Sequence, residues 1–208
     1  MSRGVFVTGT DTDAGKTVVA AALVAALGGL YWKPVQSGLE QSPGGDGAVV
    51  AALTGHLPED FPQPAYAFQA PLSPDQAAAL EGRRIDPERI VLPEVQRFLV
   101  VEGAGGLMVP LDETTLMIDL AGRLGLPVVL AARTGLGTLN HTLLSLEALA
   151  RRGLPVAGVV FSGPDHPRNL ETIRRLGGVP VLGRIPWLDP LTPAALAAAA
   201  AGLDLGGL

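Results

Sequence analysis

The feature that most constrains this sequence is the stretch of residues 4–19, which reads GVFVTGTDTDAGKTVV. A short apolar run at residues 5–7 precedes a loop rich in glycine, threonine and aspartate, and an Ala/Val/Leu segment of helical character follows at residues 18–27. A phosphate-binding loop requires this order of strand, loop and helix, because backbone N–H groups and the helix N-terminus converge there on one anion. The stretch therefore predicts a nucleotide-phosphate site near the start of the chain.

The loop ends in Gly15, Lys16 and Thr17, which supply the remaining chemistry of such a site. We expect Lys16 to reach the outer phosphate oxygens and Thr17 to bring its hydroxyl to a metal ion. The loop has one unusual feature: Thr10 stands where a first glycine is usual and Gly9 lies one residue earlier, so the loop is one residue longer. The alternative is a glycine-rich turn with a solvated lysine, but the flanking strand and helix favour phosphate binding.

Composition narrows the class of protein and of partner. A chain of 208 residues, 48% of them hydrophobic, suits one α/β domain with a buried core. The net charge is −5 and the sequence has no long run of Lys and Arg, so it predicts no basic surface that could bind nucleic acid or an anionic membrane. We therefore expect small ligands. The absence of cysteine excludes disulfides, thiolate metal sites and a cysteine nucleophile, and no secretory signal pattern is present. We therefore expect a cytoplasmic protein.

Alternating strand and helix patterns fill the rest of the chain and predict an α/β fold, with a mostly parallel, doubly wound sheet and helices on both faces of a single domain spanning residues 1–208. We expect strands at residues 30–32, 98–101, 127–132, 155–161 and 179–185, and helices at residues 48–53, 76–80, 87–95, 138–152, 167–176 and 193–201. Residues 57–75, rich in proline and aromatic side chains, predict a structured loop over a pocket, without regular elements.

Charged and polar residues follow two of the expected strands. Lys33 and Ser37 come after residues 30–32, and Glu102 comes directly after the apolar run at 98–101. Because ligands of open parallel sheets gather beyond the carboxyl ends of the strands, we expect these side chains near the phosphate loop, with Glu102 holding Mg²⁺. The alternatives are a solvated Lys33 before a proline turn and a Glu102 that begins a helix.

Two further residues stand before expected helices, where capping alone would explain them. Asp46 precedes the helix at 48–53, and its roles as N-cap and as metal ligand both remain open. Thr138 opens the helix at 138–152, where the free N–H groups form a site for a carboxylate, although simple capping by Thr138 is an equal alternative.

Five blocks of sequence taken together resemble the dethiobiotin synthetase family over nearly the whole chain. They are residues 9–17 (GTDTDAGKT), 33–38 (KPVQSG), 101–106 (VEGAGG), 137–141 (GTLNH) and 185–188 (IPWL). The lengthened phosphate loop alone is shared with amidotransferases that make cobyrinate amides. The resemblance implies an enzyme that carboxylates 7,8-diaminopelargonate with CO₂ and closes a ureido ring at the expense of ATP, with Mg²⁺, as a homodimer.

The resemblance also implies roles for individual residues. Lys16 and Lys33 would be catalytic. The nucleotide would be bound by Asp13, Ala14, Gly15, Lys16, Thr17, Val18, Asp46, Glu102, Gly103, Ala104, Gly105, Ser162, Gly163, Pro186, Trp187 and Leu188. The diamine would contact Thr12, Ser37, Thr138, Leu139 and Asn140, the last three from the neighbouring subunit, and Mg²⁺ would bind Thr17, Asp46 and Glu102. Ser162 stands where the family commonly has an asparagine that reads adenine.

Two other functions are compatible with a related loop. A switch ATPase that positions septa or plasmids carries a second lysine early in the loop, and no lysine lies between Gly4 and Gly15. A cobyrinate-type amide synthetase needs a glutaminase domain with a nucleophilic cysteine, so this chain could act in that way only on free ammonia or with a separate subunit.

Overall fold

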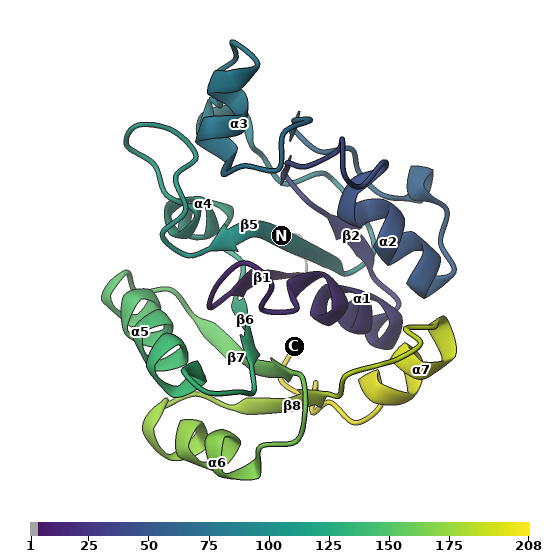
Figure 1. Cartoon of the computed structure of the whole chain (residues 1–208), viewed down its shortest axis with the longest axis vertical. Helices are drawn as coiled ribbons and strands as arrows, with labels where there is room; N and C mark the ends of the chain where they lie inside the picture. Colours follow the sequence, from purple (N-terminus) through teal and green to yellow (C-terminus); the bar gives the residue numbers. More distant parts are fainter. Residues whose placement is uncertain (1–3) are drawn as a thin grey trace.

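The computed structural model describes residues 4–208 and is built around a six-stranded sheet in which all neighbouring strands are parallel (Figure 1). The strand order is β2-β5-β1-β6-β7-β8. The strands are β1 (Gly4–Gly9), β2 (Leu30–Trp32), β5 (Leu99–Gly106), β6 (Val128–Arg133), β7 (Val156–Ser162) and β8 (Val181–Ile185). The central strands are continuous apolar runs because helices cover both of their faces. The predicted fold class is confirmed.

Helices lie on opposite faces of this sheet, and Figure 1 shows them on its two sides. One face carries α1 (Lys16–Leu27), α2 (Gly45–Thr54) and α7 (Pro193–Ala200), and the other carries α4 (Met117–Leu124), α5 (Thr138–Arg151) and α6 (Pro167–Leu176). The alternation of side chains along β1 divides the core accordingly: Val5 and Val7 pack with α1 and α2, whereas Phe6 packs with α4.

The helix α1 is largely buried, since α2 and α7 pack beside it on the sheet. Its Ala and Val residues give it short side chains, which let these neighbours approach closely. It ends at Gly28, which adopts the left-handed conformation and donates its N–H to the carbonyl of Val24. The phosphate loop is therefore held between a central strand and a buried helix.

The segment between β2 and β5 differs most from the expectation. It contains a small parallel pair, β3 (Val35–Gln36) and β4 (Tyr66–Ala67), a 3₁₀ turn at Pro58–Asp60, and the helix α3 (Pro74–Leu80). Regular elements thus occur within residues 57–75, contrary to the prediction. The helix expected at residues 87–95 is wrong as well: only the 3₁₀ turn Pro87–Arg89 forms, because Pro93 disfavours a helical conformation for the residue before it.

The helix α4 was not predicted from the sequence, and α2 and α3 begin earlier than predicted. In α4 the buried residues Met117, Leu120, Ala121 and Leu124 follow a helical period, and Asp119 accepts a hydrogen bond from the backbone N–H of Leu116 at 2.9 Å. The start of α4 lacks a Ser, Thr, Asp or Asn at the N-cap, which is the usual signal.

At the other end of the chain, the hydroxyl of Thr192 caps α7 by accepting a hydrogen bond from the backbone N–H of Ala195. Within residues 4–208, no helix is both long and apolar enough to cross a membrane.

Candidate active site

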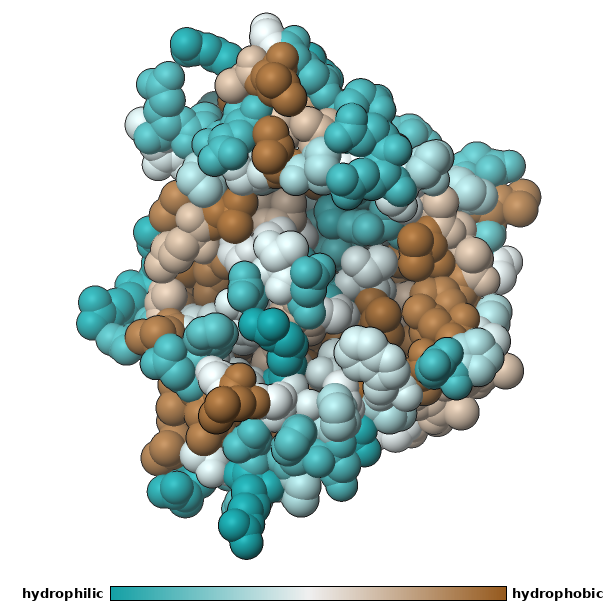
Figure 2. All heavy atoms as spheres, in the orientation of Figure 1, coloured by the Kyte–Doolittle hydropathy of each residue, from teal (hydrophilic) through white to brown (hydrophobic). Residues whose placement is uncertain are grey.

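A cleft of about 1030 Å³ opens at the edge of the sheet where the strands end, and Figure 2 shows the hollow near the centre of this face. The side chains in its walls follow or end five different strands of the sheet. The phosphate loop follows β1, Lys33 follows β2, Arg133 ends β6, Ser162 ends β7 and Pro186 follows β8. This is the edge at which open parallel sheets bind their ligands.

The phosphate loop turns sharply before α1. Asp13 and Gly15 both have positive φ, of 54° and 85°, and Gly15 is the N-cap of the helix. A Cβ at Gly15 would lie 2.6 Å from the side chain of Ser162, so only glycine fits there. Lys16 is buried and donates from Nζ to the carbonyl oxygen of Asp11 at 2.9 Å. Burial lowers the pKa of Lys16, with the Glu102 charge opposing that effect.

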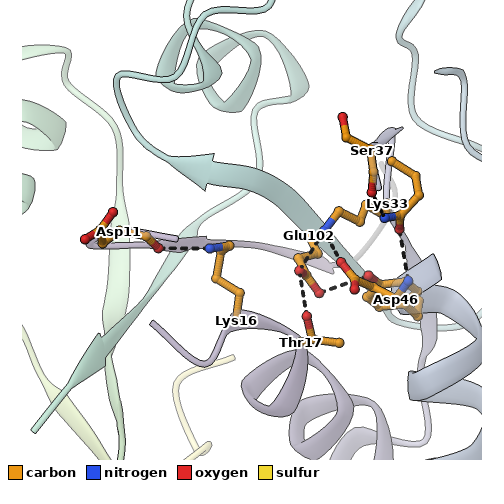
Figure 3. A network of polar contacts seen from close by, with 9 residues as sticks. Asp11, Lys16, Thr17, Lys33, Ser37, Asp46 and Glu102 are labelled. Carbon is orange, nitrogen blue, oxygen red and sulfur yellow. Dashed lines mark hydrogen bonds and ion pairs between the residues drawn. The ribbon is translucent and has the colours of Figure 1, made fainter. Parts of the chain in front are cut away.

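Lys33 stands between two carboxylates deep in the cleft (Figure 3). Its Nζ forms an ion pair with Asp46 and lies 3.1 Å from Oε1 of Glu102. Burial opposes the charge of Lys33, but the two carboxylates together raise its pKa above the usual value. The ammonium is therefore a fixed cation at the floor of the cleft.

Glu102 is itself buried, with 1% of the residue exposed, and both of its oxygens are engaged. Oε1 accepts from Thr17 Oγ1 at 3.1 Å as well as from Lys33, and Oε2 accepts from the Tyr31 hydroxyl at 2.9 Å. Burial and then the Glu102 charge raise the pKa of Tyr31 well above its usual value, so its hydroxyl stays a donor. Glu102 lies within β5, so the alternative that it begins a helix is wrong.

The two capping interpretations are also wrong. The N-cap of α2 is Gly44, and Asp46 lies in the first helical turn, where its backbone N–H donates to Oε1 of Gln36 at 3.0 Å. The N-cap of α5 is Gly137, and the Thr138 hydroxyl instead donates to the carbonyl of Arg133. Glycine in the left-handed conformation starts both helices, which frees Asp46 to face Lys33.

Most residues assigned from the sequence line one cleft. These are Thr12, Asp13, Gly15, Lys16, Thr17, Val18, Lys33, Ser37, Asp46, Glu102, Ala104, Gly105, Ser162, Pro186, Trp187 and Leu188. The cleft wall does not include Ala14, Gly103, Gly163, Thr138, Leu139 or Asn140. Gly103 faces Phe6 and Met117 on the other side of β5, and Asn140 is exposed. Residues 71–74 and Gln76 form another wall, which agrees with the expected loop over a pocket.

Three residues at this site were not identified from the sequence. Gln36 positions α2 through the Asp46 backbone, Arg133 forms an ion pair with Asp11 at 3.3 Å, and Tyr31 binds Glu102. The sequence contained a signal for Tyr31. Side chains alternate between the two faces along an extended segment, so Tyr31 lies on the same side as Lys33, two residues later, and Trp32 lies on the other side.

Thr17, Asp46 and Glu102 fit a magnesium ion. Hydroxyl and carboxylate oxygens are the donors that Mg²⁺ prefers, and the ammonium of Lys33 already attracts both carboxylates to one point. Thr17, Asp46 and Glu102 include only two carboxylates, and among residues 4–208 no group of three or more His, Cys, Asp or Glu side chains could hold a metal ion. Mg²⁺ in phosphoryl-transfer sites needs only one or two carboxylates, because phosphate oxygens and waters complete its shell.

A parallel α/β sheet with a Gly-Lys-Thr loop at its carboxyl edge defines the class of P-loop nucleoside triphosphatases. A family model described as an AAA domain matches residues 3–195. An ATP-dependent dethiobiotin synthetase of Rhodopseudomonas palustris is 50% identical over 199 residues, which are 96% of this chain and 94% of that protein. The chain belongs to the ATP-dependent dethiobiotin synthetase family.

Other similar proteins fall into two groups. The dethiobiotin synthetase of Afipia carboxidovorans is 50% identical over 96% of this chain and 94% of its own length. The biotin biosynthesis bifunctional protein of Bordetella avium is 60% identical over 90% of this chain, which spans 40% of that protein. Among solved structures, the septum site-determining protein MinD of Pyrococcus horikoshii, complexed with Mg-ADP, has a TM-score of 0.58 at 17% identity, covering 98% of this chain and 95% of that one. At that identity the likeness concerns the fold alone.

Proposed function

We propose that this chain catalyses the ATP-dependent carboxylation and ring closure of 7,8-diaminopelargonate with CO₂, giving dethiobiotin, ADP and phosphate. Membership of the dethiobiotin synthetase family supports the reaction. The structural observation that carries the proposal is Lys33, a buried cation held by two carboxylates beside the phosphate loop. The reaction draws its ATP and CO₂ from the cytoplasm, where we place the enzyme.

The chemistry explains why two lysines are needed. One amine of the diamine adds to CO₂ and loses a proton, which gives a carbamate. A carbamate is a poor electrophile, so its oxygen attacks the γ-phosphorus of ATP and ADP leaves. The second amine then attacks the carbonyl carbon, phosphate departs and the ureido ring closes. Negative charge gathers on the transferring group, and preorganised cations in a dry site stabilise such charge strongly.

Each cation of the site has a place in this scheme. The amides of residues 13–17 and Lys16 would hold the β- and γ-phosphates, so Lys16 would exchange the Asp11 carbonyl for phosphate oxygens. Lys33 would orient the carbamate and offset the charge of the transferring phosphoryl group. Thr17, Asp46 and Glu102 would hold Mg²⁺, which neutralises part of the charge on the β- and γ-phosphates when bound.

One assay tests the proposal: ADP release from MgATP and bicarbonate, with and without 7,8-diaminopelargonate. We expect ADP release to depend on the diamine and to match the dethiobiotin formed. If ADP release does not depend on the diamine and increases when DNA or liposomes are added, the protein would instead be a switch ATPase of the septum- or plasmid-positioning type. Glutamine- or ammonia-dependent release with a cobyrinate substrate would indicate an amide synthetase.

We further propose that two copies of the chain share each site. The start of α5 lies outside the cleft of its own chain, and the backbone amides of Leu139 and Asn140 belong to the first helical turn, which has no intrahelical acceptors. Leu136 is fully exposed beside this turn, and Leu144 is 56% exposed on α5. Apolar residues around free amides support contact with a second copy, whose bound diamine would place its carboxylate there.

Mixed dimers test the sharing of sites. We expect Lys16→Ala and Asn140→Pro subunits to be inactive alone, the second because proline removes the amide at 140. If sites are shared, combining them should restore roughly one working site in two per mixed dimer, because one site then receives both intact halves. Activity would be measured after co-refolding, with the dimer verified by light scattering. Failure of mixing to restore any activity would mean that each subunit keeps its own complete site.

A second prediction in this site concerns the nucleotide base. Ser162 lines the cleft with Pro186, Trp187 and Leu188. An asparagine amide presents a fixed donor and acceptor together, whereas a serine hydroxyl rotates, so discrimination against other bases should weaken. We expect GTP or CTP to support a kcat/KM within about 10² of ATP, and Ser162→Asn to widen the gap by roughly tenfold. Steady-state kinetics would check this. Values for other triphosphates more than about 10⁴ below ATP would exclude Ser162 from base selection.

A further inference from the structure

The two oxygens of the Glu102 carboxylate have different partners. Oε1 accepts from Thr17 at 3.1 Å and from Lys33 at 3.1 Å, and both of these donors line the cleft. Oε2 accepts from Tyr31 at 2.9 Å, and Tyr31 does not line the cleft. The carboxylate thus has one oxygen facing Thr17 and Lys33 in the site (Figure 3), and one fixed by Tyr31 from the protein core.

Tyr31 is held firmly enough to fix that oxygen. The residue is 2% exposed and packs in the same apolar cluster as Val50 of α2. Its ring centroid lies 5.7 Å from that of Phe61 at an interplanar angle of 56°. A Cβ at Gly47, the residue after Asp46, would lie 3.9 Å from the Tyr31 ring. The ring therefore lies beside the helical turn that presents Asp46, and Tyr31 and Val50 of α2 belong to one apolar cluster.

We propose that Tyr31 is a positioning residue of the divalent-cation site, whose hydroxyl fixes Oε2 of Glu102 so that Oε1 alone faces Thr17, Lys33 and the cation. The inference rests on the metal role given to Glu102 in the proposed function. Without the hydroxyl, Oε2 is a buried oxygen of a charged group that lacks its donor. The carboxylate then turns to engage Lys33 with both oxygens, which withdraws Oε1 from the cation.

A purely structural role for Tyr31 makes a different prediction. As a core aromatic residue it would contribute its ring packing, which phenylalanine retains, and the loss of one hydrogen bond would appear only as reduced stability. A positioning role appears in the affinity for the metal, because partners that orient ligating carboxylates typically change metal affinity by about 10- to 100-fold when removed. Metal affinity therefore separates the two roles.

The experiment compares Tyr31→Phe with Tyr66→Phe, the other tyrosine of the chain. Tyr66 is also buried, and among the described residues its hydroxyl bonds to the backbone of Asp86, at 3.0 and 3.4 Å, and to no carboxylate. Mn²⁺ would serve as the probe, with its binding followed by electron paramagnetic resonance in the presence of one equivalent of a non-hydrolysable ATP analogue. We expect Tyr31→Phe to weaken Mn²⁺ binding about tenfold and Tyr66→Phe to leave it unchanged. Binding of the analogue in excess EDTA should be the same in both.

Two further variants make the result decisive. If Tyr31 acts through Glu102, the double variant Tyr31→Phe/Glu102→Gln should bind Mn²⁺ no more weakly than Glu102→Gln alone. Phe61→Leu disturbs the packing of the ring but keeps the hydroxyl, so it should lose much less Mn²⁺ affinity than Tyr31→Phe. Unchanged Mn²⁺ binding in Tyr31→Phe, additive effects in the double variant, or an equal loss in Phe61→Leu would each overturn the inference. The Mn²⁺ binding measurement contains no diamine and no turnover, so its outcome does not depend on whether the enzyme catalyses the proposed reaction.

Discussion

Lys33→Ala should lower kcat by about 10² or more and should also lower the thermal midpoint by several degrees when no divalent cation is present. The first effect follows from the loss of a positioned cation at the transferring phosphoryl group, which is worth several kcal/mol in a dry site. The second follows from the ion pairs of Lys33, because its removal leaves the buried Glu102 facing Asp46 without a cation. Steady-state kinetics and thermal unfolding, each with and without Mg²⁺, would measure both.

Lys16→Ala provides the comparison, because it should lose as much activity without losing stability. Within residues 4–208, the hydrogen-bond acceptor of the buried Lys16 ammonium is a backbone carbonyl, that of Asp11, and burial lowers the pKa of Lys16. Its removal should therefore leave the thermal midpoint of the nucleotide-free protein unchanged or slightly higher. Lys33→Met, which keeps most of the length of the side chain without its charge, controls for packing at position 33. A Lys33→Ala enzyme with near-normal kcat would remove Lys33 from the mechanism.

The sequence was most informative where local chemistry dictates local structure. The order of strand, loop and helix around Lys16 fixes its position relative to the helix N-terminus, and Thr192-Pro193 correctly marks the start of α7. Lys33 and Glu102 follow or lie in strands of one parallel sheet, and the topology alone brings such residues to one edge. These relations depend on periodicity and strand direction, which short sequence windows contain.

The sequence was less informative where a contact depends on distant elements. Asp46 was interpreted as a possible cap because it precedes an apolar helix, but a glycine in the left-handed conformation starts that helix two residues earlier. The hydrogen bond between Tyr31 and Glu102 joins β2 to β5, and the two residues are 71 positions apart in the chain. No spacing rule within one segment predicts which hydroxyl will meet which carboxylate. The partners of buried polar groups therefore required the packed structure.

Glu102→Gln should raise the Mg²⁺ concentration needed for half-maximal activity about tenfold or more, while it changes the KM for the diamine much less. The amide keeps the size of the side chain and can still accept from Thr17 through its oxygen, but it removes the charge that attracts the cation. Asp46→Asn should act in the same direction with a smaller effect, because Asp46 is partly exposed and water screens its charge. Activity would be titrated with Mg²⁺ at saturating diamine.

The comparison between the two variants separates metal binding from support of Lys33, since each carboxylate also pairs with that ammonium. A role limited to orienting Lys33 would lower kcat at every Mg²⁺ concentration and leave the half-saturating concentration unchanged. A metal role would shift that concentration and allow much of kcat to return at high Mg²⁺, because mass action compensates for weaker binding. Asp119→Asn is the control, because Asp119 forms an ion pair with Arg152 that is more exposed and lies outside the cleft. If the half-saturating Mg²⁺ concentration is unchanged in both Glu102→Gln and Asp46→Asn, the two carboxylates orient Lys33 and do not bind the metal.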